Sequence, residues 1–219
     1  MDAGADPTSE ARERMVRDQI ERRGLREPRL TRALRRVPRH RFMPEVRSQQ
    51  AYGDHPLPIG SSQTISQPYI VALMTSELQL RGTERVLELG TGSGYQTAVL
   101  AELAAEVFTV ERLPELAERA RSLLEVLGYA NIQFRTGDGT VGWSEAAPFD
   151  GILVTAGSPR LPRPLIDQLA EGGRLVVPVG DRWVQDLAVV EKRAGGALDE
   201  TSAGGCRFVP LIGEHGWDG

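Results

Sequence analysis

The sequence is poor in the residues that bind metals or form disulfides. It has one cysteine, Cys206, and three histidines, His40, His55 and His215, among 219 residues. A lone cysteine cannot form an intramolecular disulfide, and histidines this scattered do not have the spacing of metal ligands. We therefore expect no structural metal and no disulfide.

Long hydrophobic runs are also missing. No apolar stretch approaches the roughly 20 residues that a transmembrane helix needs, and residues 1–7 lack the basic start and apolar run of a secretory signal. These two absences predict a cytoplasmic protein that does not insert into a membrane.

The length and composition fit one α/β domain with a sizeable core. Hydrophobic residues make up 40% and charged residues 26% of the chain. Residues 1–8 are small and acidic with nothing to bury, so we expect a disordered tail there. The rest, 9–219, is expected to be a single domain with parts 9–67, 68–180 and 181–219.

Charge is unevenly distributed. The formal net charge is −4, yet residues 10–47 hold 13 of the 26 basic residues against 6 acidic ones. Clustered arginine can contact phosphates, so a nucleic-acid-binding arm is one interpretation. The other is an amphipathic helix that packs on the body, since acidic residues are interleaved and Leu30, Leu34 and Val37 recur at helical spacing. The second is favoured, and we expect no nucleic-acid partner.

The N-terminal third has two predicted helices and a long loop. Helices are predicted over 9–23, with Ser9 as cap, and over 28–37, with Pro28 in the first turn. Residues 38–67 are rich in proline and glycine, which predicts an irregular connection. Connections of that length inside a compact domain are usually functional or disordered.

After residue 68 the pattern alternates between helices and short apolar strands. Helices are predicted over 68–80, 95–104, 114–127 and 162–170, and strands over 85–89, 107–110, 132–135, 151–155 and 174–178. Such alternation predicts a doubly wound, mostly parallel sheet with helices on both faces. Two further strands, 187–191 and 207–211, are expected to form a C-terminal antiparallel hairpin across the glycine-rich stretch 193–205.

The first predicted strand runs directly into Gly90-Thr91-Gly92-Ser93-Gly94. Ligands bind at the carboxyl ends of strands in open α/β sheets, and glycine lets a ligand approach the main chain. A dinucleotide motif would need glycine where Tyr95 stands, and a P-loop would need a lysine, whereas Lys192 is the only lysine. The G-x-G-x-G spacing after Glu88 resembles the first motif of class I methyltransferases, which bind S-adenosylmethionine. That resemblance implies a Rossmann-like fold.

Two further strand ends carry acidic residues. Glu111 follows the second strand, 21 residues after Gly90, where a carboxylate can accept hydrogen bonds from both ribose hydroxyls of an adenosine. Asp138, flanked by Gly137 and Gly139 after the third strand, can meet the adenine amino group, although a simple turn is the alternative. Residues at three strand ends are thus expected to contact one adenosine.

The absence of one motif narrows the class of molecule that could accept the methyl group. The segment 154–159 after the fourth strand lacks the Asn/Asp-Pro-Pro-Tyr/Phe motif of many amino methyltransferases of bases. This absence weakens the nucleic-acid interpretation further.

Taken as a whole, the chain resembles the protein-L-isoaspartate O-methyltransferases. The most distinctive match is Gln63-Thr64-Ile65-Ser66-Gln67-Pro68. Other matching stretches are Ala51–Asp54, Pro56–Gly60, Val86–Tyr95, Gly137–Gly139, Ala147–Asp150, Gln168–Leu175 and Arg207–Leu211. One departure is Ser62, where the family usually has glycine.

The resemblance implies roles for individual residues. Ser66 stands in the position that the family treats as catalytic. The implied cofactor-binding residues are Thr64, Ile65, Ser66, Glu88, Gly90, Gly92, Ser93, Gly94, Glu111, Arg112, Asp138 and Gly139. The implied substrate-binding residues, which flank an extended peptide, are Ile59, Gly60, Val209, Pro210 and Leu211.

The resemblance also implies an activity. We expect methyl transfer from S-adenosylmethionine to the α-carboxylate of L-isoaspartyl residues in damaged proteins, which leaves S-adenosylhomocysteine and an ester that collapses to a succinimide. The expected partners are isoaspartyl-containing proteins and peptides, and the enzyme is expected to be a monomer. Two alternatives remain: an aspartate O-methyltransferase dedicated to one peptide product, and a nucleic-acid-binding protein that uses the arginine-rich N-terminus.

Overall fold

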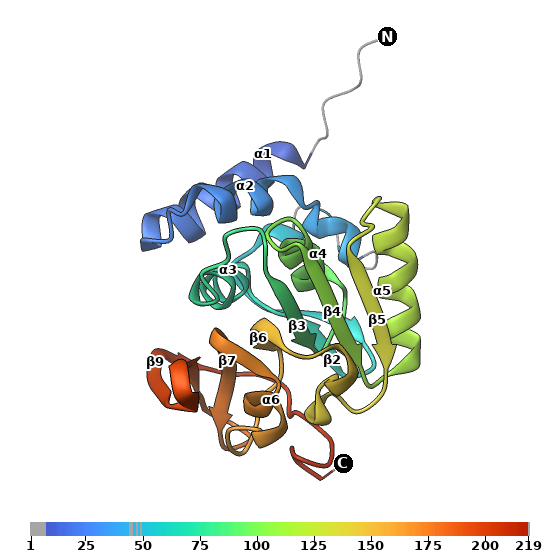
Figure 1. Cartoon of the computed structure of the whole chain (residues 1–219). Helices are drawn as coiled ribbons and strands as arrows, with labels where there is room; N and C mark the ends of the chain where they lie inside the picture. Colours follow the sequence, from blue (N-terminus) through green and yellow to red (C-terminus); the bar gives the residue numbers. More distant parts are fainter. Residues whose placement is uncertain (1–7, 44–45, 47, 49, 219) are drawn as a thin grey trace.

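A seven-stranded mixed sheet forms the centre of the computed structural model, which describes residues 8–43, 46, 48 and 50–218 (Figure 1). The strands are β3 (Arg85–Leu89), β4 (Glu106–Glu111), β5 (Ile132–Thr136), β6 (Phe149–Val154), β7 (Leu169–Gly180), β8 (Gln185–Lys192) and β9 (Leu198–Cys206). Their order is β5-β4-β3-β6-β7-β8-β9, and the first five are parallel to one another. This order confirms the predicted Rossmann-like fold class.

As predicted, one helix lies directly before the parallel strands and three connect them, while only 3₁₀ turns lie between β5 and β6. The helices are α3 (Pro68–Glu77), α4 (Tyr95–Ala101), α5 (Pro114–Val126) and α6 (Arg163–Asp167), with short 3₁₀ turns η5 (Gly139–Val141), η6 (Ser144–Ala146) and η7 (Ala194–Gly196). Proline opens α3 and α5 because its fixed φ suits the first helical turn. Gly128 follows the end of α5. Its φ of 84° is in the left-handed region that favours glycine, so the helix cannot continue through it.

The order of the strands reverses at β3. β4 pairs with β3 on one side and β6 pairs with it on the other, both in parallel. Leu87 and Leu89 on β3 are fully buried, because helices cover both faces of a parallel sheet. The carboxyl ends of β3, β4 and β6 therefore meet at a topological switch point, where ligands bind in such folds.

The C-terminal strands differ from the prediction. β8 does pair antiparallel with its neighbour, but that neighbour is β9 at 198–206, not the predicted strand 207–211. β9 is an edge strand whose side chains are mostly exposed, so no apolar alternation marked it in the sequence. Residues 207–211 instead cross the end of the sheet, where Pro210 bridges to Gly157.

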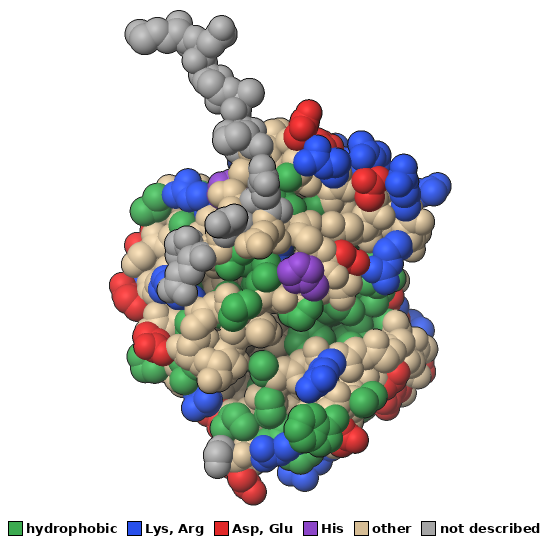
Figure 2. All heavy atoms as spheres, turned by 180° about the vertical axis from the view of Figure 1, so that it is seen from behind, with side chains coloured by type: hydrophobic (Ala, Val, Ile, Leu, Met, Phe, Trp, Pro, Cys, Tyr) green, Lys and Arg blue, Asp and Glu red, His purple; other side chains and the backbone are tan. Residues whose placement is uncertain are grey.

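The arginine-rich N-terminal helices pack on the body. They comprise α1 (Ser9–Arg14), the π-helical η1 (Met15–Ile20), η2 (Glu21–Arg23) and α2 (Pro28–Arg36). Leu30, Leu34 and Val37 are buried, as the amphipathic interpretation predicts. Basic and acidic side chains lie side by side on the outer surface of this region, where Arg35 bridges to both Glu13 and Glu21 (Figure 2).

Two predictions for the N-terminal region were wrong. Thr8, not Ser9, is the N-cap residue of α1, and Thr8 is buried although it was assigned to the disordered tail. The rest of that tail, 1–7, lies outside the described residues. Within the described ranges, no helix has both the length and the apolar character required to span a membrane.

The predicted irregular connection contains regular elements. They are the 3₁₀ turns η3 (Arg39–Phe42) and η4 (Gln50–Tyr52) and the strands β1 (Leu57–Gly60) and β2 (Gln63–Ile65), which form an antiparallel hairpin. α5 fastens this hairpin, because Arg119 donates to the Ile59 carbonyl at 2.6 Å and Ser61 donates to Glu115. The hairpin thus lies against the glycine-rich loop, with the Ile59 side chain near Gly92.

Candidate active site

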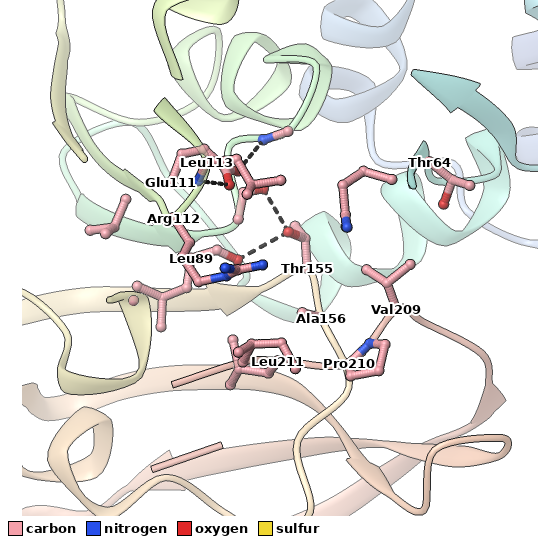
Figure 3. A pocket seen from close by; sticks show the side chains of 16 residues that line it. Thr64, Leu89, Glu111, Arg112, Leu113, Thr155, Ala156, Val209, Pro210 and Leu211 are labelled. Carbon is pink, nitrogen blue, oxygen red and sulfur yellow. Dashed lines mark hydrogen bonds between the residues drawn. The ribbon is translucent and has the colours of Figure 1, made fainter. Parts of the chain in front are cut away.

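A pocket opens at the carboxyl ends of β3, β4 and β6. Figure 3 shows Glu111 and Arg112 on one side of it, Val209, Pro210 and Leu211 on another, and Thr155 between them. Its lining consists of Gln63, Thr64, Leu89, Gly90, Gly92, Val110, Glu111, Arg112, Leu113, Gly139, Thr155, Ala156, Val209, Pro210, Leu211 and Ile212. We call this the donor pocket.

The glycine-rich loop requires glycine at Gly90. Its φ is 97°, and a Cβ built there would lie 2.3 Å from the Thr155 hydroxyl oxygen. Thr155 donates a hydrogen bond to the Gly90 carbonyl at 2.7 Å, so loop and neighbouring strand end are locked together. Gly92, with φ of 54°, leaves the centre of the loop without a side chain. The part of the lining formed by Gly90 and Gly92 is therefore bare main chain.

Glu111 is held by the main chain at the rim of the donor pocket. One carboxylate oxygen accepts from the Gly92 N–H and the other from the Leu113 N–H, both at 2.9 Å. Each oxygen of an ionised carboxylate has two lone pairs, so one acceptor position on each remains. A pair of neighbouring hydroxyl groups fits these two positions.

Glu88 lies beneath the loop and does not line the pocket. It is completely buried and accepts from the Thr97 and Thr109 hydroxyls at 2.6 and 2.7 Å. Thr109 also shares a 2.6 Å hydrogen bond with the hydroxyl of Thr91 in the glycine-rich loop. Burial raises the pKa of Glu88 to about 8, so the carboxyl group is protonated at neutral pH. This network supports the loop from below.

Asp138 also lies outside the pocket lining. One of its oxygens accepts from the Thr140 N–H and hydroxyl at 2.8 and 2.7 Å, and the other from the Glu214 N–H at 2.8 Å. Burial raises the pKa of Asp138, but the hydrogen bonds from Glu214 and Thr140 outweigh it and keep the pKa below its usual value. Asp138 therefore fastens the C-terminal segment beside the pocket, and contact with an adenine stays a prediction.

That C-terminal segment, residues 212–217, closes one side of the donor pocket. His215 N–H donates to the Thr140 hydroxyl at 3.0 Å, and the Trp217 indole N–H donates to the Gly157 carbonyl at 3.0 Å. Ile212 at its start lines the pocket. Nothing in the sequence pattern marked this closure, because it depends on contacts between residues at least 60 positions apart.

Ser66 lies in a second pocket that adjoins the first. Pro56, Thr64, Ser66, Gln67, Ile70, Thr155, Gly205, Cys206, Arg207, Phe208 and Val209 line it. Thr64, Thr155 and Val209 line both pockets, so the two spaces meet at these residues. We call the second one the acceptor pocket, and Arg207 brings a positive charge to its wall.

Ser66 does not cap the helix that follows it. The N-cap residue of α3 is Gln67, and no side chain caps this helix. The Ser66 hydroxyl lies in a pocket wall, where it can donate to an oxygen of a bound molecule.

The structure brings together most of the predicted site residues. Those in the donor pocket are Thr64, Gly90, Gly92, Glu111, Arg112, Gly139, Val209, Pro210 and Leu211. Those outside it are Ile59, Gly60, Ile65, Ser66, Glu88, Ser93, Gly94 and Asp138. The binding roles of both groups stay predictions. The lining residues to which the sequence assigned no role are Gln63, Leu89, Val110, Leu113, Thr155, Ala156 and Ile212. Thr155 could have been found, because it directly follows β6, the strand next to β3.

No metal site accompanies the pockets in the part of the chain that the structure describes. Among these residues, no group of three His, Cys, Asp or Glu side chains lies close enough to hold a metal ion.

Comparison with known proteins identifies close relatives. The sequence model of the protein-L-isoaspartate(D-aspartate) O-methyltransferase family matches residues 10–216. Protein-L-isoaspartate O-methyltransferase 1 of Syntrophobacter fumaroxidans is 60% identical over 95% of this chain and 97% of its own length. The protein-L-isoaspartate O-methyltransferase of Syntrophus aciditrophicus is 58% identical over 98% of this chain and 99% of its own length.

Solved structures agree with the sequence comparison. A protein-L-isoaspartate O-methyltransferase superposes with a TM-score of 0.85 at 30% identity, over 94% of this chain and 67% of the other. A putative protein-L-isoaspartate O-methyltransferase from Plasmodium falciparum, in complex with S-adenosyl-L-homocysteine, gives a TM-score of 0.79 at 25% identity, over 93% of this chain and 97% of the other.

Proposed function

The chain belongs to the protein-L-isoaspartate(D-aspartate) O-methyltransferase family and is an S-adenosylmethionine-dependent methyltransferase, and we propose how its two pockets divide the reaction. The donor pocket binds S-adenosylmethionine. The acceptor pocket binds the α-carboxylate of an L-isoaspartyl residue in a protein or peptide. The observation that carries this proposal is that the two pockets meet at Thr64, Thr155 and Val209, with Ser66 in the acceptor wall.

The donor pocket fits the cofactor chemically. Two spare acceptor positions on Glu111 suit the neighbouring ribose hydroxyls, and the bare main chain at Gly90 and Gly92 lets a ligand approach closely. Leu89, Val110, Leu113 and Leu211 supply apolar walls for a flat base. When bound, S-adenosylmethionine supplies an electrophilic methyl group on a sulfonium sulfur.

Methyl transfer to the carboxylate requires correct orientation of that carboxylate more than it requires proton transfer. A carboxylate with an ordinary pKa near ~4 is already ionised at neutral pH, so it requires no general base. Ser66 donates a hydrogen bond to one carboxylate oxygen and leaves the other free to attack. Arg207 in the same wall attracts the anionic acceptor. Positioning of this kind contributes several kcal/mol to methyl transfer, up to about 11 kcal/mol for a well-oriented pair.

A pair of matched peptides tests the reaction. The protein is incubated with S-adenosylmethionine labelled in its methyl group and with two peptides that differ only in one isoaspartyl or aspartyl residue. We expect label in the isoaspartyl peptide alone, released again by mild base as methanol. Equal labelling of both peptides, or of neither, would refute the proposal.

A substitution tests the role of Ser66. Ser66→Ala is expected to lower kcat by about 10-fold or more while the Kd for S-adenosylhomocysteine stays within about 3-fold, since only orientation in the acceptor pocket is lost. Ser62→Ala, in the turn of the hairpin just before Ser66 but in neither pocket, is the control. An unchanged kcat in Ser66→Ala would show that the hydroxyl is dispensable.

We also propose that residues 9–219 act as one domain, as a monomer in the cytoplasm. Residues 9–67 contribute the N-terminal helices and residues 50–67, which lead to Ser66 and which we call the acceptor loop. Residues 68–180 contribute the cofactor-binding core, and residues 181–219 contribute the C-terminal strands and Arg207. One chain lines both pockets, which supports a site that needs no second copy. Sedimentation equilibrium over a range of concentrations tests the monomer, and a mass twice that of the chain would contradict it.

A further inference from the structure

Arg39 is the largest fully buried side chain in the described part of the molecule, and the proposed reaction gives it no role. It begins η3 in the segment before the acceptor loop and has 0% of its surface exposed. No carboxylate among the described residues pairs with it. Burial lowers the pKa of Arg39, yet guanidinium is so basic that it stays charged. A buried cation with no carboxylate partner among the described residues is costly there, so its contacts call for an explanation.

The contacts of Arg39 join three segments of the chain, those at Ala51, Ser66 and Tyr95. Arg39 Nε donates to the Ala51 carbonyl at 2.9 Å and Nη2 donates to the Ser66 carbonyl at 2.7 Å. The guanidinium carbon lies 4.7 Å from the centre of the Tyr95 ring, a cation–π distance. Tyr95 is the first residue of α4, directly after the glycine-rich loop. One side chain thus connects the acceptor loop to the start of the donor-site helix.

The rigidity of Tyr95 strengthens this connection. Tyr95 is itself fully buried, and Phe42 of η3 packs edge-on against its ring at 5.6 Å between centroids. The guanidinium fork is planar, so two carbonyl acceptors and one stacked ring fix its position and its plane together. The carbonyl of Ser66 is therefore held at a set distance from α4, although Ser66 and Tyr95 are separated by 29 residues.

We propose that Arg39 is a positioning residue for methyl transfer, which fixes the Ser66 main chain relative to the donor pocket without touching either substrate. This inference rests on the proposed function of Ser66. A lysine at this position could keep the charge but not the fork, and methionine could keep only the bulk. Geometry, not charge alone, is the property that Arg39 supplies.

Arg29 provides a matched control. It also donates to two main-chain carbonyls, those of Leu80 and Leu103, at 3.2 and 3.0 Å. It lines neither pocket and contacts neither Ser66 nor Tyr95. Arg29→Met therefore removes an equal number of carbonyl hydrogen bonds, none of them to Ala51 or Ser66.

Steady-state kinetics provide the first test. We expect Arg39→Met to lower kcat for an isoaspartyl peptide by about 100-fold, because a shift of about 1 Å in the reacting groups costs that much. The Kd for S-adenosylhomocysteine, measured by calorimetry, should change by less than about 3-fold. Arg39→Lys should recover about 10-fold of the lost rate. Arg29→Met should keep the wild-type kcat. Equal loss of kcat in Arg39→Met and Arg29→Met, or no loss in Arg39→Met, overturns the proposal.

Hydrogen–deuterium exchange provides a second test that does not depend on activity. Arg39→Lys, the milder change should Arg39→Met fail to fold, is expected to speed exchange in residues 50–67, and Arg29→Met is not. Unchanged exchange in Arg39→Lys overturns the proposal. If the wild-type protein does not methylate isoaspartyl peptides, the proposed function fails, and the exchange experiment still decides whether Arg39 holds the loop.

Discussion

The carboxylate of Glu111 accepts a hydrogen bond from the main-chain N–H of Gly92 at 2.9 Å, so the end of β4 and the middle of the glycine-rich loop are directly joined. The loop therefore owes its position to a residue 19 places further along the chain. The same carboxylate keeps an acceptor position on each oxygen for a ligand. Glu111 both shapes the donor pocket and faces it.

Glu111→Gln should weaken cofactor binding. The amide keeps the size of the side chain, but it replaces one acceptor oxygen with a donor that meets the N–H of Gly92 or Leu113. Hydrogen bonds to charged groups contribute about 1.5–3 kcal/mol each, so we expect the Kd for S-adenosylhomocysteine to rise about 10- to 100-fold. Calorimetry measures this change.

Glu84→Gln is the matched control for Glu111→Gln. Glu84 also accepts main-chain N–H groups, those of Arg81, Gly82 and Thr83, but it lies outside the donor pocket before β3 begins. It should lose stability without losing cofactor affinity. Equal affinities for the wild type and Glu111→Gln would mean that Glu111 has no role in cofactor binding.

Asp138→Ala should loosen the C-terminal segment that closes the donor pocket. Asp138 holds Glu214 and Thr140, and Ile212 nearby lines the pocket. We expect the Kd for S-adenosylhomocysteine to rise about 10-fold, since a hydrogen bond to a charged acceptor and an apolar contact are lost together. Asp181→Ala is the control, because Asp181 accepts the N–H groups of Trp183 and Val184 in the β7–β8 turn instead.

Trp217→Ala separates closure by the segment from direct contact with the ligand. Trp217 donates to the Gly157 carbonyl and anchors the same segment without contacting Asp138. If Asp138 acts through the segment, Trp217→Ala weakens binding as well. A loss of affinity in Asp138→Ala with none in Trp217→Ala would favour direct contact between Asp138 and the adenine.

The parallel core could be predicted from sequence because its signals are local. The apolar strand 85–89 and the helix that begins at Pro114 each carry their own boundaries of glycine or proline. The edge strand β9 could not be predicted. Only one edge of it pairs, with β8, and its side chains are almost all exposed, so its sequence has no apolar alternation. The hairpin β1–β2 was hidden for another reason: it is short, contains Pro58 and turns through two serines.

Local sequence pattern predicted the site only at the ends of strands, whereas Thr64 and Val209–Leu211 were predicted from the family resemblance. Glu111 and Gly90 were found because Glu111 ends the apolar strand β4 and Gly90 directly follows the apolar strand β3. Ile212 was missed because the pocket receives it only after Asp138 and Thr140 bind the C-terminal segment. Arg39 was missed because an arginine in a basic stretch gives no sign in the sequence that it is buried. Tertiary contacts decide these cases, and one sequence does not contain their pattern.

Glu88 should make stability depend on pH. Its folded pKa is about 8, against 4.5 for the unfolded value, because burial disfavours the charged form. Between these values the folded state retains a proton that the unfolded state has released, so stability falls as pH rises from about 4.5 to 8. The slope approaches about 1.4 kcal/mol per pH unit. Glu88→Gln, which cannot titrate, should lose this contribution.

Urea unfolding of both proteins between about pH 5 and pH 8 measures the effect, and subtraction removes every other titrating group. We expect the wild type to become progressively less stable relative to Glu88→Gln as pH rises. A stability difference that stays constant over this range would show that Glu88 titrates near its ordinary pKa.

Ser62→Gly should stabilise the hairpin turn where this chain departs from the family's usual glycine. Ser61 and Ser62 have φ of 50° and 57°, in the left-handed region that favours glycine. Relief of that conformation contributes about 1–2 kcal/mol, and the extra freedom of glycine in the unfolded chain offsets about 0.5–1 kcal/mol. We expect a net gain of about 0.5–1 kcal/mol in the free energy of unfolding by urea. Ser62 rather than Ser61 is the site to change, because the Ser61 hydroxyl donates to Glu115.

Ser122→Gly is the control, because a serine-to-glycine change inside a helix should lower the free energy of unfolding instead of raising it. Ser122 is exposed inside α5, where glycine lowers stability by about 0.5–1 kcal/mol. A gain in Ser62→Gly together with a loss in Ser122→Gly identifies backbone conformation as the cause. If Ser62→Gly is neutral or destabilising, the turn imposes no strain on Ser62, and the serine costs this chain nothing relative to the glycine of its family.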